Sequence, residues 1–300
     1  MTTSTQTVSV PHLGGISASY MTSGPIDHSK PTLVLVNSFT TSAELYRDAL
    51  SNSALTSKMN LLAIELLGHG QTRAKTEHWT YWDTAIMNLQ VMEKLGVERA
   101  FALGTSQGGW VVARMALLSP EKISGILPLG TSLDTESPRS RSLGCWDALD
   151  SLQHLITTDF TSNTQSSSTF TPPSSFADFL ISSGFGPNCP QAMKEFWTEQ
   201  LKKNYEGEEG RKRIRMAAIN LRDRDGLHLR AGDIKCPVLW LHGTDDAVYS
   251  VANAQEEIKL FTGSENARLE VIQGGQHFLS ASNPEEVFGY VTEFVGKYAK

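Results

Sequence analysis

Short apolar runs alternate along most of this chain with longer stretches in which apolar residues recur every three or four positions. The short runs are typical of buried strands, and the longer periodic stretches are typical of helices with one buried face. Strands that alternate with helices predict a mostly parallel sheet covered on both faces. The predicted strands, of which the first two form a hairpin, span residues 7–10, 16–21, 32–36, 61–65, 100–103, 126–129, 236–242 and 267–272.

Several predicted helices carry boundary signals of their own. Ser42 precedes the helical stretch 43–50, and its hydroxyl can cap the free N–H groups of the first turn. The stretch 81–95 has its apolar residues on one face and is followed by Gly96, a common residue at helix ends. The last stretch, residues 284–298, has the pattern of a helix that packs back on the sheet.

The alternation of strands and helices stops near Asp134 and resumes near Ile234. The intervening segment is helical in pattern, except for residues 161–175, which are rich in serine, threonine and proline and predict a loop. An all-helical insertion after the sixth strand predicts a lid that lines the substrate pocket and excludes water from it. Residues 1–133 and 231–300 are therefore predicted to form a core domain, and residues 134–230 the lid. The predicted lid helices span residues 146–156, 176–183, 191–205 and 211–221.

Composition narrows the class of protein and its partners. The 300 residues, of which 40% are hydrophobic, suit one large α/β domain with an insertion or two small domains. No apolar run approaches the roughly 18 residues that a membrane span requires. The net charge is −6 and no basic block exists, which argues against nucleic acid or an anionic membrane as a partner. The expected partner is a small-molecule substrate.

The cysteines and the amino-terminal residues suggest a compartment. The amino terminus has neither the basic nor the apolar segment of a secretory signal. An odd number of cysteines fits free thiols under reducing conditions, so the protein is expected in the cytoplasm. The sequence shows no metal-ligand spacing and no glycine-rich phosphate loop, so we expect neither a metal nor a cofactor. The three cysteines are Cys145, Cys189 and Cys236.

One motif points to a specific chemistry. Residues 104–109 read Gly-Thr-Ser-Gln-Gly-Gly and lie between a predicted strand and a helical stretch, the context that gives a G-x-S-x-G match its meaning. Gly104 and Gly108 leave room for a crowded turn in which a Cβ atom would clash. The helix that begins behind Ser106 directs free N–H groups toward any negative charge formed there. We therefore predict that Ser106 is a nucleophile rather than an ordinary turn residue.

A serine nucleophile needs a base to take its proton and an acid to orient that base. His277 follows the last predicted strand, beside two glycines, and is the predicted base. Asp245 and Asp246 follow the preceding strand, and both are good turn residues. The residues alone therefore leave the acid as Asp246 or Asp245.

Three blocks of this sequence resemble the lidded α/β-hydrolases, from about Leu33 to the carboxyl terminus. They are residues 103–109, residues 236–246 and residues 274–277, and residues 65–72 resemble the family's turn after the fourth strand. The resemblance implies an α/β-hydrolase fold. It has a mostly parallel eight-stranded sheet, helices on both faces and a helical lid after the sixth strand.

The resemblance also implies roles for individual residues. The family's acid usually lies three residues after the glycine that ends the seventh strand, which favours Asp246. A minority of members place the acid after the sixth strand, where Asp134 and Glu136 are the candidates. The oxyanion hole is formed by two backbone N–H groups, which here belong to Gln107 and Phe39.

The loop that contains Phe39 departs from the family pattern. The family usually has His-Gly-x-Pro after the third strand, whereas this chain has Asn-Ser-Phe-Thr at residues 37–40. The loop therefore has no glycine, proline or histidine to set its geometry. Each oxyanion N–H is worth roughly 3 kcal/mol of transition-state stabilisation, so the path of this loop decides much of the rate.

The lid aromatics Trp146, Phe185 and Trp197 are candidates for an apolar pocket, although each can equally be ordinary packing. The sequence thus predicts a serine hydrolase that cleaves a carboxylic ester or lactone through an acyl-enzyme. The substrate is expected to be a medium-sized, fairly apolar molecule. Two alternatives stay open. The same triad can serve carbon–carbon bond hydrolysis or perhydrolysis, or the chain can be a ligand-binding member of the fold.

Overall fold

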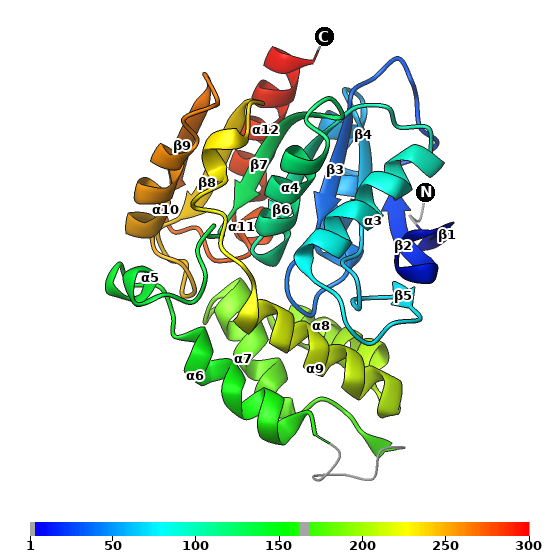
Figure 1. Cartoon of the computed structure of the whole chain (residues 1–300), viewed down its shortest axis with the longest axis vertical. Coiled ribbons are helices and arrows are strands. Elements are labelled where there is room, and N and C mark those ends of the chain that lie inside the picture. The colour runs from blue at the N-terminus through cyan, green and yellow to red at the C-terminus, as the bar shows by residue number, and fades with distance from the viewer. Residues whose placement is uncertain (1–3, 162–168, 300) are drawn as a thin grey trace.

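The computed structural model describes residues 4–161 and 169–299 and has a nine-stranded sheet at its centre (Figure 1). Eight strands follow the order β1-β2-β4-β3-β6-β7-β8-β9, and the two-residue β5 pairs with β2 outside this order. The strands from β4 to β9 along this path pair in parallel, and only β1, β2 and β5 are antiparallel. The strands are β1 (Gln6–Val10), β2 (Ile16–Thr22), β3 (Thr32–Val36), β4 (Asn60–Ile64), β5 (Arg73–Ala74), β6 (Ala100–Thr105), β7 (Ile123–Leu129), β8 (Val238–Gly243) and β9 (Ala267–Ile272).

Helices cover both faces of the sheet, because alternate side chains of each buried strand point to opposite faces. Leu33 and Leu35 of β3 pack in one apolar cluster with the last helices of the chain, whereas Val34 and Val36 pack in another with α3 and α4. The mostly parallel sheet with two covered faces is therefore confirmed. The core helices are α1 (Arg47–Ser51), α2 (Ser53–Thr56), α3 (Tyr81–Lys94), α4 (Gln107–Leu118), α10 (Val251–Glu257), α11 (Leu279–Ser282) and α12 (Pro284–Tyr298), with short turns η1 (His12–Gly14), η2 (Ala43–Tyr46), η5 (Ala231–Asp233) and η6 (Ile258–Leu260).

Most of the helices between β7 and β8 lie together at one end of the sheet, below the core in Figure 1, and the first of them lies to one side. Their apolar faces join the same cluster as the last helices of the chain, through residues such as Ile181 and Ala217. Part of the predicted loop at 161–175 lies outside the described residues, and α7 begins at the end of it. These helices are α5 (Pro138–Ser142), α6 (Ala148–His154), η3 (Leu155–Asp159), α7 (Ser174–Phe185), α8 (Gln191–Tyr205) and α9 (Gly207–Asp223).

Some element boundaries differ from the predicted ones, since β7 begins at Ile123 rather than at residue 126 and α6 spans Ala148–His154 rather than residues 146–156. Helix α9 begins at Gly207, four residues before the predicted start, because Glu208 and Glu209 occupy its first turn. Carboxylates are favourable there, but they carry no apolar signal that a periodicity search detects. In the described part of the chain, every helix is too short or too polar to cross a lipid bilayer.

Candidate active site

Ser106 lies at a sharp turn between β6 and α4, with φ +52° and ψ −116°. A non-glycine residue at positive φ is strained and persists only where its surroundings hold it. The Ser106 N–H donates to Leu129 O at 2.8 Å, and Thr131 Oγ1 donates to Ser106 O at 2.7 Å. The turn thus presents Ser106 at the carboxyl end of the sheet.

Two glycines make this turn possible. A Cβ atom built on Gly104 would lie 2.1 Å from the carbonyl oxygen of Gly108, and one built on Gly108 would lie 2.2 Å from Val36 O. Both contacts are with backbone, which cannot move aside as a flexible side chain can. The sequence argument that the turn requires glycine at both positions therefore has a direct steric cause.

The structure brings His277 and Asp246 together from two neighbouring strands. His277 follows β9 and Asp246 follows β8, and His277 Nδ1 lies 3.0 Å from both carboxylate oxygens of Asp246. Asp246 Oδ1 also accepts the N–H groups of Val248 at 2.8 Å and Tyr249 at 2.9 Å. Burial raises the pKa of the Asp246 carboxyl, but the charges of His277 and His242 and the hydrogen bonds from His277 and the Tyr249 N–H outweigh burial, so that the pKa lies below its usual value. Asp246 is therefore a carboxylate at neutral pH.

The other acidic candidates lie elsewhere. Asp245 is exposed and accepts a hydrogen bond from the neighbouring Thr244 hydroxyl. Glu136 pairs with Arg224 at 2.6 Å, and Asp134 belongs to a separate cluster described below. Within residues 4–161 and 169–299, none of these three carboxylates bonds to the imidazole that Asp246 holds.

Ser106 and His277 line one small cavity between the sheet and the inserted helices. Its volume is about 30 Å³, which leaves little room beside the serine. In the described part of the chain the lining has no Lys, Arg, Asp or Glu side chain. The aromatic and aliphatic residues that line it include Phe39, Trp146, Phe179, Leu180 and Phe278.

Only one of the three predicted lid aromatics reaches this cavity. Trp146 lines it and stacks on Phe179, with ring centroids 5.9 Å apart and an interplanar angle of 20°. Phe185 packs on Phe278 at 4.9 Å instead, and Trp197 packs on Phe185 at 5.8 Å. The sequence did not single out Phe179 or Phe278. The available signal for Phe278 was its position directly after the predicted base. Phe179 carried no such signal, because only the orientation of α7 decides that it faces the cavity.

The two predicted oxyanion donors lie beside Ser106. Gln107 is the first residue of α4, so its N–H has no partner within the helix. Phe39 lines the same cavity as Ser106. Among the described residues, neither of these two N–H groups donates to another backbone group.

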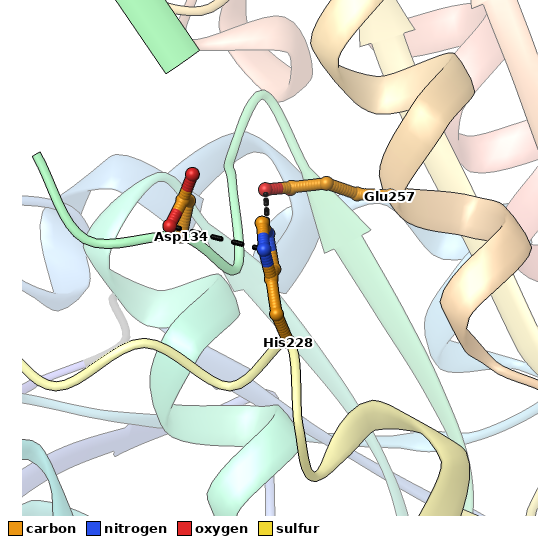
Figure 2. A group of neighbouring side chains, drawn as sticks. All are labelled: Asp134, His228 and Glu257. Atoms are coloured by element: carbon orange, nitrogen blue, oxygen red, sulfur yellow. Dashed lines mark hydrogen bonds and ion pairs between the residues drawn. The ribbon is translucent and has the colours of Figure 1, made fainter. Parts of the chain in front are cut away.

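One cluster joins residues that the sequence did not connect. Figure 2 shows His228 between Glu257 of α10 and Asp134, which follows β7. His228 Nε2 lies 2.7 Å from Glu257 Oε1, and Nδ1 lies 3.8 Å from Asp134 Oδ1. Asp134 and His228 lie near the two ends of the insertion, so the cluster fastens both ends to a core helix.

Imidazole and carboxylate groups also bind metal ions, but here they already bond to one another and to their surroundings. The hydrogen bond to Glu257, opposed in part by burial, raises the pKa of His228, which favours an imidazolium between two carboxylates. We call this cluster the insertion clamp. Further donors to the two carboxylates are the hydroxyls of Ser132 and Ser137 and the backbone N–H groups of Leu133 and Thr135.

Residues 31–284 match the family model described as alpha/beta hydrolase fold. The chain therefore belongs to the alpha/beta hydrolase family. A curated relative, the uncharacterized hydrolase YugF of Bacillus subtilis, is 32% identical over 104 residues, which are 34% of this chain and 37% of the relative. The chain spans less than half the length of the curated relatives that it matches.

Solved structures share the fold over nearly the whole chain. An esterase from Exiguobacterium antarcticum has a TM-score of 0.79 at 17% identity, covering 97% of this chain and 100% of that one. The enol-lactonase from Burkholderia xenovorans LB400 has a TM-score of 0.71 at 17% identity, covering 96% and 100%. At this identity the likeness establishes the fold.

Proposed function

We propose that the protein is a serine hydrolase that cleaves a carboxylic ester or lactone through an acyl-enzyme. The observation that carries this proposal is that Ser106 and His277 line one cavity and that the Asp246 carboxylate lies on Nδ1 of the imidazole. An imidazole held in this way has its Nε2 free to accept a proton.

The proposed reaction has two halves. Ser106 Oγ attacks the substrate carbonyl carbon while His277 Nε2 takes the hydroxyl proton, and the negative oxygen accepts the N–H groups of Phe39 and Gln107. The tetrahedral intermediate collapses, the bond to the leaving oxygen breaks, and His277 returns its proton to that oxygen. A water molecule then repeats these steps on the acyl-enzyme and releases the acid. Asp246 stabilises the imidazolium in both halves.

The lining of the cavity supports an uncharged substrate. Aromatic and aliphatic side chains surround Ser106, and among the described lining residues there is no cation that would pair with a substrate carboxylate. A neutral ester or lactone with apolar substituents fits this chemistry. The likeness to an esterase and an enol-lactonase agrees with this class of reaction.

The decisive experiment measures hydrolysis of p-nitrophenyl acetate and a panel of simple lactones by the purified protein. We expect turnover by the wild type and a loss of roughly 10⁴-fold or more in S106A, since the nucleophile is removed. A fluorophosphonate should label the wild type at Ser106 and leave S106A unlabelled. A folded wild type that neither turns over substrate nor takes the label would be a ligand-binding member of the family instead.

A further inference from the structure

The loop after β3 is held by side-chain hydrogen bonds rather than by glycine or proline. Asn37 is fully buried, and its amide contacts the backbone in three places. Oδ1 accepts the Leu66 N–H at 2.9 Å, while Nδ2 donates to Thr41 O at 2.9 Å and to Ser38 O at 3.1 Å. The amide orientation is fixed by these partners, because the reverse orientation would place NH₂ against an N–H group and oxygen against two carbonyls.

The backbone that Asn37 spans is strained. Thr40 has φ +54°, a left-handed conformation in a residue with a branched side chain. Such a conformation persists only where its surroundings enforce it. Thr41 also holds the loop in this conformation, since its hydroxyl accepts the Ser38 N–H at 3.0 Å and donates to Ser38 O at 2.8 Å. Phe39, whose N–H is the proposed second oxyanion donor, lies between these fixed points.

We propose that Asn37 is a positioning residue whose amide fixes the Phe39 N–H for the oxyanion. This inference rests on the proposed function. Asn37 replaces the glycine and proline of the usual loop by tying the turn at residues 38–41 to the neighbouring segment at Leu66. An oxyanion donor is effective only when its N–H lies within about 2.7–3.1 Å of the developing charge, so a small shift of the loop reduces transition-state binding. Substrate binding, which uses the apolar lining, is affected less.

Asn60 is a matched control, because its buried side-chain amide also bonds to the backbone of a turn, at the opposite end of the sheet. Asn60 is the first residue of β4, is 6% exposed, and is far from Ser106 in the register of the strands. Its Oδ1 accepts the Asp27 N–H at 2.9 Å and its Nδ2 donates to Asp27 O at 2.9 Å and Lys30 O at 3.2 Å. N37D and N60D therefore make the same chemical change in similar buried turns.

The experiment compares N37D and N60D with the wild type in ester hydrolysis and in inhibition by a trifluoromethyl ketone, which forms a tetrahedral oxyanion on serine. We expect N37D to lower kcat roughly 10- to 100-fold at nearly unchanged KM, and to weaken the inhibitor by a similar factor. N60D should lower the melting temperature comparably and leave both kinetic quantities within about threefold. A merely structural role for Asn37 would make the two variants alike.

If N37D does not fold, T41V provides the same comparison, because it removes the hydroxyl bonds to Ser38 and keeps the side-chain shape. The expected result is a fall in kcat and in inhibitor affinity by the same factor, with KM unchanged. Full activity of folded N37D, or of T41V in its place, overturns the inference while the proposed function stands. If the wild type shows neither ester turnover nor fluorophosphonate labelling, the proposed function itself is wrong.

Discussion

His277 Nδ1 lies 3.0 Å from each carboxylate oxygen of Asp246, while the adjacent Asp245 is exposed and bonds to the hydroxyl of Thr244. Two neighbouring aspartates of one turn thus have separate surroundings. The buried one faces the imidazole, and the exposed one belongs to the turn. This difference allows the two to be tested against each other.

We predict that D246N lowers kcat/KM by roughly 10⁴-fold, because asparagine keeps the shape but removes the charge that stabilises the imidazolium. D245N is the matched control and should stay within about twofold of the wild type in p-nitrophenyl acetate hydrolysis. A loss in D245N as large as that in D246N would contradict the assignment of the acid.

The insertion clamp predicts a pH dependence of stability. The pKa of His228 is raised by Glu257, with Asp134 adding to the effect and burial and Arg139 opposing it. A group whose pKa is raised on folding stabilises the protein fully below its unfolded pKa, and this stabilisation is lost as pH rises through the folded pKa. The difference in melting temperature between wild type and H228Q should therefore be largest at about pH 6 and shrink above the usual histidine pKa of about 6.5.

The control for this measurement is H154Q, since His154 is 69% exposed beside Asp159. An exposed pair contributes little, so H154Q should follow the wild type at every pH. A melting-temperature difference for H228Q that stays constant from pH 6 to pH 9 would show that His228 acts through packing alone.

Two glycine substitutions should have opposite effects. G108A places a methyl group 2.2 Å from Val36 O and is expected to prevent the serine turn from forming, with loss of folding or activity. G289A adds a methyl group in α12, where no atom beyond the adjoining helix backbone and chain neighbours lies within 4 Å, and should stabilise the protein by about 1 kcal/mol through helix propensity. Urea unfolding measures the stability of both variants. A G108A variant with wild-type stability and activity would contradict the steric account of the turn.

The stacked pair of Phe179 and Trp146 predicts a limit on substrate size. F179A removes one of these rings from the cavity lining and should raise kcat/KM for p-nitrophenyl hexanoate relative to the acetate by roughly 10-fold or more. Phe196 packs on Trp197 and does not line the cavity, so F196A serves as the control. An unchanged ratio in F179A would mean that this ring does not limit the chain length.

Local signals predicted the fold well because each element follows from its own residues. Strand β3 and helix α12 match the predicted bounds, because their apolar patterns depend only on neighbours in sequence. The sequence also predicted that Ser106, Asp246 and His277 lie at one edge of the sheet, because each residue follows a strand and parallel strands end at the same edge.

Other features depend on distant contacts and left no local signal. Asp134, His228 and Glu257 meet only in the folded chain, and their spacing matches no motif. Phe185 and Phe179 both lie on α7, and only the packing of that helix decides that one faces Phe278 and the other faces the cavity. The role of Asn37 likewise depends on Leu66, whose N–H reaches it from the next strand's loop.

The narrow space beside Ser106 has a kinetic consequence. Its volume is only about 30 Å³, so we expect α7 and its neighbours to move when an ester enters and again when the product leaves. When the chemical steps are fast, such a movement sets the upper limit of kcat. Added glycerol or sucrose should then lower kcat for the best substrates in proportion to solvent viscosity. For poor substrates, whose kcat is limited by bond cleavage, viscosity should have no effect.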